Sequence, residues 1–446
     1  MTQPWTLPWN QRKPIAIVGA VALFGVLGSA AVFAVHQVPQ AGPLVANSLR
    51  AVIGSEAVAR LEEAAASAED TVMRLRRLPS RSLSDLSPSI IGAGVAASSA
   101  APLAPIETNS SIETNSSIET NRSSAGVREE ALAAAAPIPC RVFAPPPITP
   151  PFSEVAAPGD GVWIGVPDPE QPQAPELMYK TLIHPDPERR YAELFIVSMP
   201  RSMIRLTSVP GTEEPSSDNP AVASLPHRGL VPADQRGELL AAFNGGFRAE
   251  HGQHGMMVSG VTILPPRPEM CTIFGYEDGT LQIGTYSGIA AHPQRPIWYR
   301  QAARCMVEQG MLHPWLRDPN AVGWGSSLEG DTVIRRSAIA LSQDQETLFV
   351  AVTNFTTARA LAVGMSLAGG WNVAQLDVNR SFPRFLLFPR DERGVRHGAS
   401  LFEGFLYQRD EMISEANPRD FFYIVRHARD ERSEAAAVMG SPQQAG

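Results

Sequence analysis

The chain has few of the residues that mark nucleic-acid-binding or zinc-binding proteins. Only 18% of its 446 residues are charged and its net charge is -8, so no basic surface for nucleic acid is indicated. Its 9 histidines form no HxxxH pair, and its 3 cysteines lack the spacing of zinc ligands. We therefore expect no nucleic-acid partner, no metal site and no cofactor.

Because the chain has only 3 cysteines, it can form at most one internal disulfide. One disulfide plus one odd thiol would fit an oxidising compartment. Cys271 and Cys305 both lie in the part of the chain that is expected to be globular, whereas Cys140 does not. We expect the bond between Cys271 and Cys305, and three unpaired thiols are the alternative.

One long uncharged run, residues 15–35, stands out near the N-terminus. Its length of about 21 residues would cross a bilayer as a helix. Arg12 and Lys13 precede the run and the next basic residue is Arg50, so residues 1–14 should be cytoplasmic and the rest extracytoplasmic, either periplasmic or extracellular. A cleaved signal peptide is the alternative, although its apolar region usually spans only about 7 to 15 residues. We expect a single-pass membrane protein with an N-terminal anchor.

Residues 55–78 are expected to form a juxtamembrane helix that ends before Pro79. Acidic residues lie early in this segment and basic residues late, which complements the helix dipole. Its apolar residues alternate in steps of three and four: Val58, Leu61, Ala65, Ala68, Val72 and Leu75. Such a helix either pairs with a partner helix or docks on its own domain, and the sequence leaves both open.

Residues 80–158 are dominated by Ser, Ala and Pro and contain a hexapeptide repeat between Pro105 and Arg122. So few large apolar residues cannot offset the entropy lost on ordering, which predicts a disordered linker. Residues 431–446 are expected to be a disordered tail. The globular domain should therefore span residues 159–430.

Short strand-like runs separated by Pro, Asp and Gly fill residues 159–430. Thr356 is the expected cap of one apolar helix over residues 357–367. Many hairpins and few helices predict an α+β domain with a largely antiparallel or mixed sheet. The expected strands cover residues 162–166, 178–184, 191–198, 203–209, 239–243, 258–264, 271–276, 280–286, 333–341, 347–352 and 372–376.

The segment Phe243-Asn244-Gly245-Gly246-Phe247 lies where an apolar run ends and a loop begins. Glycine at Gly245 and Gly246 would allow positive φ and close approach of the backbone to a ligand. The Asn244 amide can both donate and accept hydrogen bonds. This is a candidate ligand-binding turn, with an ordinary strand-end turn as the alternative.

The order of motifs resembles the phosphodiester glycosidase family, whose members include an enzyme that removes N-acetylglucosamine from a phosphodiester on mannose-bearing glycans. Asn-Gly-Gly-Phe is followed by Gly255-Met256-Met257, Gln309-Gly310, Arg336-Ser337, a capped helix and Leu376-Asp377. The resemblance covers roughly residues 159–427 and rests on motif order more than on any single motif. Val378, Asn379 and Arg380 stand where the family has glycines.

The resemblance implies roles for particular residues. Asp377 would act as nucleophile or base, Arg336 would hold the phosphate, and Asn244 would position the sugar. The remaining expected substrate-binding residues are Gly245, Gly246, His254, Ser337 and Arg380.

Three functions are compatible with these features. The leading one is a membrane-anchored extracytoplasmic hydrolase that cleaves a sugar-1-phosphodiester in an envelope or secreted glycan. The alternative is a catalytically inactive domain of the same fold that binds a glycan or an envelope protein, favoured by replacement of the glycines after Asp377. A structural or assembly protein is the third. The expected partners are a glycan or glycosyl-phosphate substrate and the membrane.

Overall fold

The computed structural model describes most of the C-terminal domain and one N-terminal segment. The described residues are 48, 52–76, 78–86, 143–168, 170–171, 174–290, 293–318, 323–325 and 332–427. In this part of the chain, no helix is both long and apolar enough to cross a bilayer. The expected anchor at residues 15–35, the cytoplasmic residues 1–14 and the tail at residues 431–446 lie outside it.

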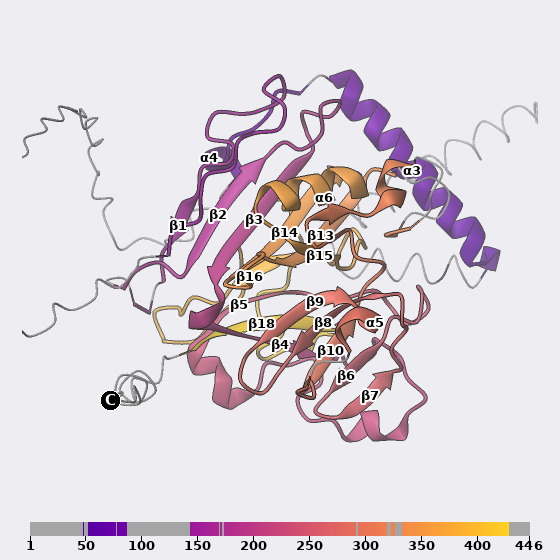
Figure 1. The fold of residues 1–446 in the computed structure, drawn as a ribbon, viewed down its shortest axis with the longest axis vertical. Helices are drawn as coiled ribbons and strands as arrows, with labels where there is room; N and C mark the ends of the chain where they lie inside the picture. The colour runs from indigo at the N-terminus through magenta and orange to yellow at the C-terminus, as the bar shows by residue number, and fades with distance from the viewer. Residues whose placement is uncertain are drawn as a thin grey trace, which may run out of the picture. The chain divides into compact units, whose positions relative to one another are not determined.

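The domain is built from three sheets, and every pairing between its named strands is antiparallel (Figure 1). The α+β expectation with a largely antiparallel sheet is thus confirmed for these residues. The largest sheet has eight strands in the order β1 (Ile164–Val166), β2 (Met178–Ile183), β3 (Glu193–Pro200), β14 (Thr347–Thr356), β13 (Ile334–Leu341), β15 (Asn372–Gln375), β11 (Val307–Glu308) and β12 (Met311–Leu312).

Two sheets of five strands complete the domain. One runs β17 (Ala399–Ser400), β16 (Phe385–Leu387), β5 (Leu239–Asn244), β18 (Phe421–Arg426) and β4 (Ile204–Val209). The other runs β7 (Val261–Leu264), β6 (Met256–Val258), β10 (Trp298–Gln301), β8 (Cys271–Gly275) and β9 (Leu281–Thr285). No expected strand covers β10, β11, β12, β16, β17 or β18.

Helices are few. They are α3 (Ser55–Arg76), α4 (Leu83–Leu86), α5 (Tyr286–Ile289) and α6 (Ala358–Leu367), with short 3-10 helices η1 (Arg201–Met203), η2 (Pro220–Ser224), η3 (Ala233–Glu238) and η4 (Pro314–Arg317). The α6 cap is Thr357, not the expected Thr356: its side chain accepts a hydrogen bond from the Ala360 N–H at 3.1 Å. Thr356 is instead the last residue of β14.

The main hydrophobic core lies between α6 and the eight-stranded sheet. Leu361 and Met365 of α6 belong to one buried cluster with Ala338 and Ala340 of β13. Because side chains alternate along a strand, the residues between these alanines point to the other face of the sheet. This alternation decides which β13 residues can reach the site described below.

The ordered domain begins earlier than the sequence predicted. Residues 143–158 were assigned to the linker, yet Ile148 and Val155 are buried. The backbone N–H of Ile148 also donates to the Gly161 carbonyl oxygen at 2.9 Å. The segment is rich in proline, and its composition concealed the two apolar side chains that hold it against the sheet.

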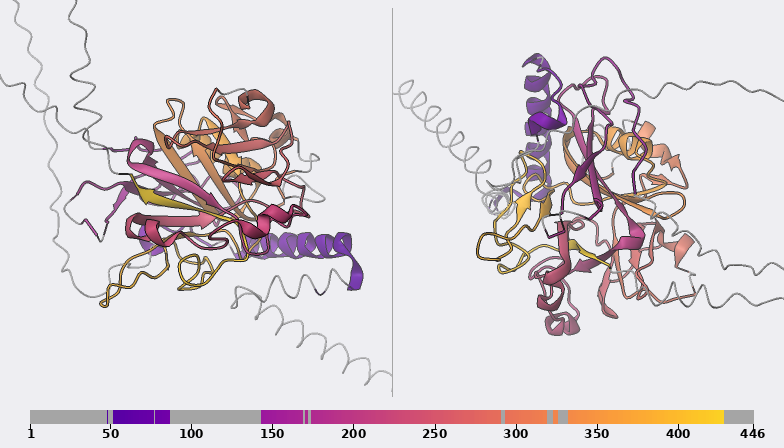
Figure 2. Two further views of the ribbon diagram at one scale, coloured as in Figure 1. Left: turned by 90° about the horizontal axis from the view of Figure 1, so that it is seen from below. Right: turned by 90° about the vertical axis from the view of Figure 1, so that its left-hand side faces the viewer.

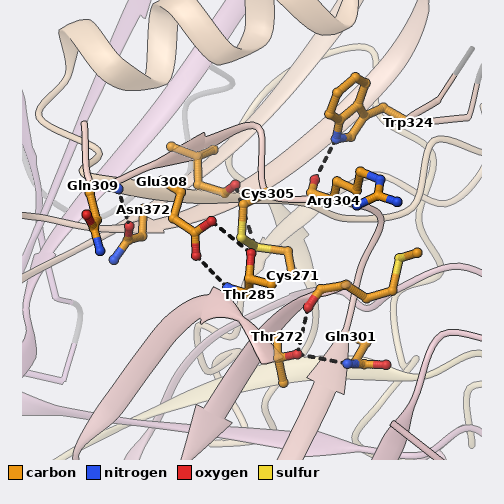
Figure 3. The surroundings of a disulfide bond; sticks show 12 residues. Cys271, Thr272, Thr285, Gln301, Arg304, Cys305, Glu308, Gln309, Trp324 and Asn372 are labelled. Carbon is orange, nitrogen blue, oxygen red and sulfur yellow. Dashed lines mark hydrogen bonds between the residues drawn. A yellow bond between two sulfur atoms is a disulfide. The ribbon is translucent and has the colours of Figure 1, made fainter. Parts of the chain in front are cut away.

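A disulfide joins Cys271 and Cys305, as expected (Figure 3). Cys271 begins β8, and Cys305 precedes β11 of the eight-stranded sheet. Beside the bond, the carboxylate of Glu308 accepts hydrogen bonds from the Thr285 N–H at 2.6 Å and from its hydroxyl at 2.8 Å. The disulfide therefore links a five-stranded sheet to the eight-stranded one.

Replacing both cysteines by alanine should lower the free energy of unfolding by about 3–4 kcal/mol, because a cross-link between residues 34 positions apart restricts the unfolded chain. Urea unfolding of the full chain without reductant measures this. Cys140→Ala is the control and should leave the unfolding midpoint unchanged. A double variant as stable as this control would contradict the prediction.

Candidate functional site

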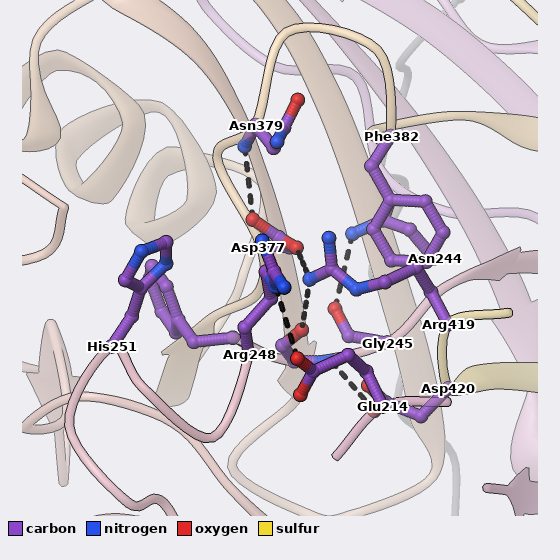
Figure 4. A network of polar contacts seen from close by, with 12 residues as sticks. Glu214, Asn244, Gly245, Arg248, His251, Asp377, Asn379, Phe382, Arg419 and Asp420 are labelled. Atoms are coloured by element: carbon purple, nitrogen blue, oxygen red, sulfur yellow. Dashed lines mark hydrogen bonds and ion pairs between the residues drawn. The ribbon is translucent and has the colours of Figure 1, made fainter. Parts of the chain in front are cut away.

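A single hydroxyl group joins the amide and the acid that the sequence singled out. The Asn244 Nδ2 donates to Ser337 Oγ at 2.8 Å, and Ser337 Oγ donates to the Asp377 carbonyl oxygen at 2.9 Å. The three residues are 0%, 0% and 3% exposed, respectively. Residues that are far apart in the sequence thus meet in one buried cluster (Figure 4).

Strand ends from two sheets place these groups together. Asn244 is the last residue of β5, Ser337 lies in β13, and Asp377 follows β15. Backbone hydrogen bonds fix the junction: the Asp377 N–H donates to the Gly245 carbonyl oxygen at 3.1 Å, and the Leu376 N–H donates to the Ser337 carbonyl oxygen at 2.8 Å. The pairing of the strands therefore places Asn244, Ser337 and Asp377 together at this junction.

The Asn244 side chain organises the junction. Besides Ser337, its Nδ2 donates to the Gly245 carbonyl oxygen at 3.2 Å, and its Oδ1 accepts from the Arg384 N–H at 3.2 Å. Both ends of the amide are therefore engaged within the protein. This geometry gives Asn244 a positioning role and does not support direct contact between its side chain and a sugar.

The Asp377 carboxylate has two partners, one on each oxygen. Oδ1 accepts from the Asn379 N–H at 2.9 Å, and Oδ2 pairs with Nη2 of Arg419. The backbone turn at Asn379 occupies a position where the resemblance implied glycine. Val378, Asn379 and Arg380 have no positive φ, so this loop follows a course that a β-branched residue can adopt.

Arg419 is the guanidinium of this site, and the sequence analysis missed it. Its Nη2 also reaches the Gly246 carbonyl oxygen at 3.4 Å, and its guanidinium carbon lies 4.6 Å from the centre of the Phe382 ring. Its Nε is buried and has no hydrogen-bond partner among the described residues. A buried donor without a partner is rare, and its hydrogen-bonding capacity is unused among the described residues.

Gly245 and Gly246 serve a purpose other than the expected one. Neither has a positive φ. A Cβ on Gly245 would lie 2.2 Å from the Asp420 carboxylate, and one on Gly246 would lie 2.6 Å from the Arg300 guanidinium. Arg300 and Asp420 form an ion pair at 2.8 Å with both side chains 0% exposed. The glycines therefore admit a buried ion pair; their expected part in ligand binding remains a prediction.

Arg336, which was expected to hold the phosphate, lies apart from Asp377. It shares a face of β13 with Ala338 and Ala340, under α6, whereas Ser337 faces Asn244. Its guanidinium donates to four oxygens, those of Thr356, Trp324, Gln375 and Thr332. Burial lowers its pKa to about 9. These contacts indicate a structural arginine and do not support phosphate binding.

Arg380 is also engaged elsewhere. Its guanidinium pairs with Glu69 of α3 at 2.6 Å and lies 6.0 Å from the centre of the Phe355 ring. The structure thus brings together Asn244, Ser337 and Asp377 of the predicted site residues. It separates Arg336 from them by the sheet, and it ties Arg380 to the N-terminal helix.

A second polar network follows the glycine turn (Figure 4). Arg248 pairs with Glu214 and Glu250, both at 3.0 Å, and Glu250 lies 3.5 Å from His251. Burial raises the pKa of Glu214, but hydrogen bonds from the Ala249 N–H and Arg248 outweigh burial and lower it overall. Glu214 therefore stays ionised and holds Arg248 beside the turn.

His254 was expected to bind substrate and is instead a buried neutral ring. Burial, aided by the charge of Arg300, lowers its pKa to about 3. Its ring packs against Phe247 with 5.5 Å between ring centres, and its Nδ1 is buried without a partner among the described residues. Binding by this side chain remains a prediction.

Within the part of the chain that the structure describes, no cluster of three or more His, Cys, Asp or Glu side chains could hold a metal ion. The absence of a metal or cofactor from the mechanism stays a prediction. The residues that the sequence analysis missed, Arg300, Arg419 and Asp420, gave one signal: charged residues directly before or within an apolar strand.

No family model and no curated protein matches this chain. Among solved structures, the chain is similar to the catalytic domain of zebrafish N-acetylglucosamine-1-phosphodiester alpha-N-acetylglucosaminidase, auto-inhibited by its pro-peptide. The identity is 15%, 58% of this chain and 85% of that chain are covered, and the TM-score is 0.37. A hypothetical protein from Synechocystis is 11% identical, with 57% and 65% covered and a TM-score of 0.30. Values this low carry no argument about the fold or the activity of this chain.

The buried histidine makes stability depend on pH. A group whose pKa is lower in the folded protein than its ordinary value of 6.5 is protonated first in the unfolded chain, so its stabilisation is lost as the pH falls from about 6.5 toward 3. The free energy of unfolding should fall between pH 7 and pH 5 in both proteins. In the His254→Gln variant this fall should be about 2 kcal/mol smaller than in the unchanged protein. Urea unfolding at both pH values measures this, and identical losses would contradict it.

Proposed function

We propose that this protein is a membrane-anchored extracytoplasmic hydrolase that cleaves a sugar-1-phosphodiester in an envelope or secreted glycan. The observation that carries the proposal is the meeting of Asn244, Ser337 and Asp377 at one strand junction, next to Arg419. A carboxylate next to a guanidinium is the pair that this chemistry needs. The anchor and the location come from the uncharged run at residues 15–35.

Arg419 is the group that binds the phosphate in this proposal. Its side chain is 13% exposed, is stacked on Phe382 and has a free Nε. The planar guanidinium can present Nε and one Nη to two phosphate oxygens together. A bound phosphodiester competes with Asp377 for these donors, so binding loosens the ion pair and releases the carboxylate.

Asp377 then attacks the anomeric carbon or removes a proton from the attacking water. The bond between the anomeric carbon and the phosphate oxygen breaks, and its electron pair leaves with the phosphate monoester. Such a leaving group requires no strong proton donor, so one carboxylate suffices. If Asp377 attacks, water then hydrolyses the glycosyl ester on Asp377 and frees the carboxylate. In both routes water supplies the hydroxyl group of the released sugar, and its other proton passes to the solvent. Asn244 and Ser337 hold the backbone of Asp377 in place.

The second candidate is a domain of the same fold that binds a glycan or an envelope protein without turnover. Two observations favour it: the carboxylate of Asp377 is 3% exposed and already paired, and Arg380 is bound to Glu69. In that function the pair of Arg419 and Asp377 stabilises the fold. The two candidates differ in what removal of the Asp377 charge does.

Asp377→Asn should lower kcat for hydrolysis of aryl sugar-1-phosphodiesters at least about 100-fold, because the amide can neither attack nor accept a proton. Substrate affinity should not fall, because Arg419 remains and no longer pairs with a carboxylate. The measurement is phosphate monoester release by the full-length protein in detergent, with a panel of sugars.

Asp186→Asn is the matched control, since Asp186 is 5% exposed and pairs with Arg189 at 2.8 Å in another part of the domain. It should keep full activity at a similar cost in stability. Equal rates for Asp377→Asn and the unchanged protein would remove Asp377 from the mechanism. Glycan binding without release of product from any substrate of the panel would favour the second candidate.

A further inference from the structure

The N-terminal helix α3 docks on its own domain through polar contacts. Asp70 accepts hydrogen bonds from Arg189, Nε at 2.9 Å and Nη2 at 3.2 Å. Glu63 accepts from the Thr332 hydroxyl at 2.6 Å, and Glu69 pairs with Arg380 at 2.6 Å. Glu63 and Asp70 are seven residues apart, or about two helical turns, so they lie on one face of α3.

Except at Val58, which is 2% exposed, the apolar stripe of α3 points away from these contacts. Leu61, Val72 and Leu75 are 56%, 45% and 77% exposed, although large aliphatic side chains are usually buried. Ala65 and Ala68 lie between them on the same line and are exposed too. The stripe of Leu61, Ala65, Ala68, Val72 and Leu75 is thus covered by nothing in the described part of the chain. Figure 2 shows α3 from two sides.

The steps of four, three, four and three residues in this stripe are those of a coiled coil. In heptad notation Ala65 and Val72 occupy position a, while Leu61, Ala68 and Leu75 occupy position d. Glu63 and Asp70, which hold the domain, then occupy position f, opposite the seam. One helix can therefore dock on its domain and pair with another helix at the same time.

We propose that the stripe pairs with α3 of a second copy of this chain, in a parallel two-stranded coiled coil. Among parallel coiled coils, Val72 at position a with Leu61 and Leu75 at position d favours two strands over a larger number. In that arrangement the charged e residues Glu62, Glu69 and Arg76 face the neutral g residues of the other copy, so no like charges meet.

The chain that precedes α3 supports the same occupant. Residues 1–47 lie outside the described part and include the uncharged run at residues 15–35. Two copies anchored by that run would enter their α3 helices in the same direction. Anchoring also raises the effective concentration of the copies, which two heptads require because so short a seam is weak in dilute solution.

Cysteine cross-linking in membranes tests the arrangement. In a full-length chain that carries Cys140→Ser, Ala68→Cys at position d should form a disulfide with its own counterpart on mild oxidation. The expected product has twice the chain mass of 48.0 kDa on a non-reducing gel. The matched control is Ser67→Cys, which is equally exposed but off the stripe and should stay monomeric.

A second variant keeps the test independent of cysteine chemistry. Val72→Glu in the otherwise unchanged full-length chain should weaken self-association in detergent at least about tenfold, measured as molar mass against concentration. Ser67→Glu should have no effect, and neither exposed change should alter the melting temperature. Equal cross-linking at residues 67 and 68, no product at residue 68, or an adduct with a protein of another mass would overturn the proposal.

Discussion

The fold of the site depends on the hydroxyl group of Ser337, which connects β5 of one sheet with the end of β15 in another through Asn244 and Asp377. Strand pairing fixes its direction, because Ser337 must point away from the α6 face that Ala338 occupies. The buried ion pair of Arg300 and Asp420 holds the glycine turn in place, because the Asp420 carboxylate accepts a hydrogen bond from the Gly246 N–H. The chemistry of Asp377 and Arg419 rests on this frame.

Sequence reasoning identified Asn244 and Asp377 at strand ends and Ser337 within a strand. Each follows or lies in an apolar run, and the resemblance in motif order associated the three. The face on which a strand residue points is set by the packing of sheets, which periodicity alone does not reveal. For that reason Arg336 was predicted to hold the phosphate beside Asp377, although its guanidinium donates to carbonyl oxygens under α6.

Arg419 could not be recognised for a related reason. It lies 42 residues from Asp377, in a loop before β18, and only the pairing of β18 with β5 brings the two together. The glycines after Asn244 were predicted to let a ligand approach the backbone, and in the structure the ion pair of Arg300 and Asp420 lies against them. The start of the domain at residue 143 was hidden by a proline-rich composition.

The N-terminal helix and the site share one connection. Arg380 follows the turn that holds the Asp377 carboxylate, and it is bound by Glu69 of α3. The sequence left open whether the helix docks on its domain or pairs with another helix. The polar face docks in the structure, and the apolar face remains available.

The central claim is that the acid, the serine bridge and Arg419 form a site for a glycosyl phosphate. A crystal structure of the protein with a glycosyl phosphonate that resists hydrolysis tests it most directly. The account predicts a phosphonate oxygen within hydrogen-bond distance of Arg419 Nε and the anomeric carbon facing the Asp377 carboxylate. A phosphonate bound elsewhere, with the pair of Arg419 and Asp377 intact, would contradict it.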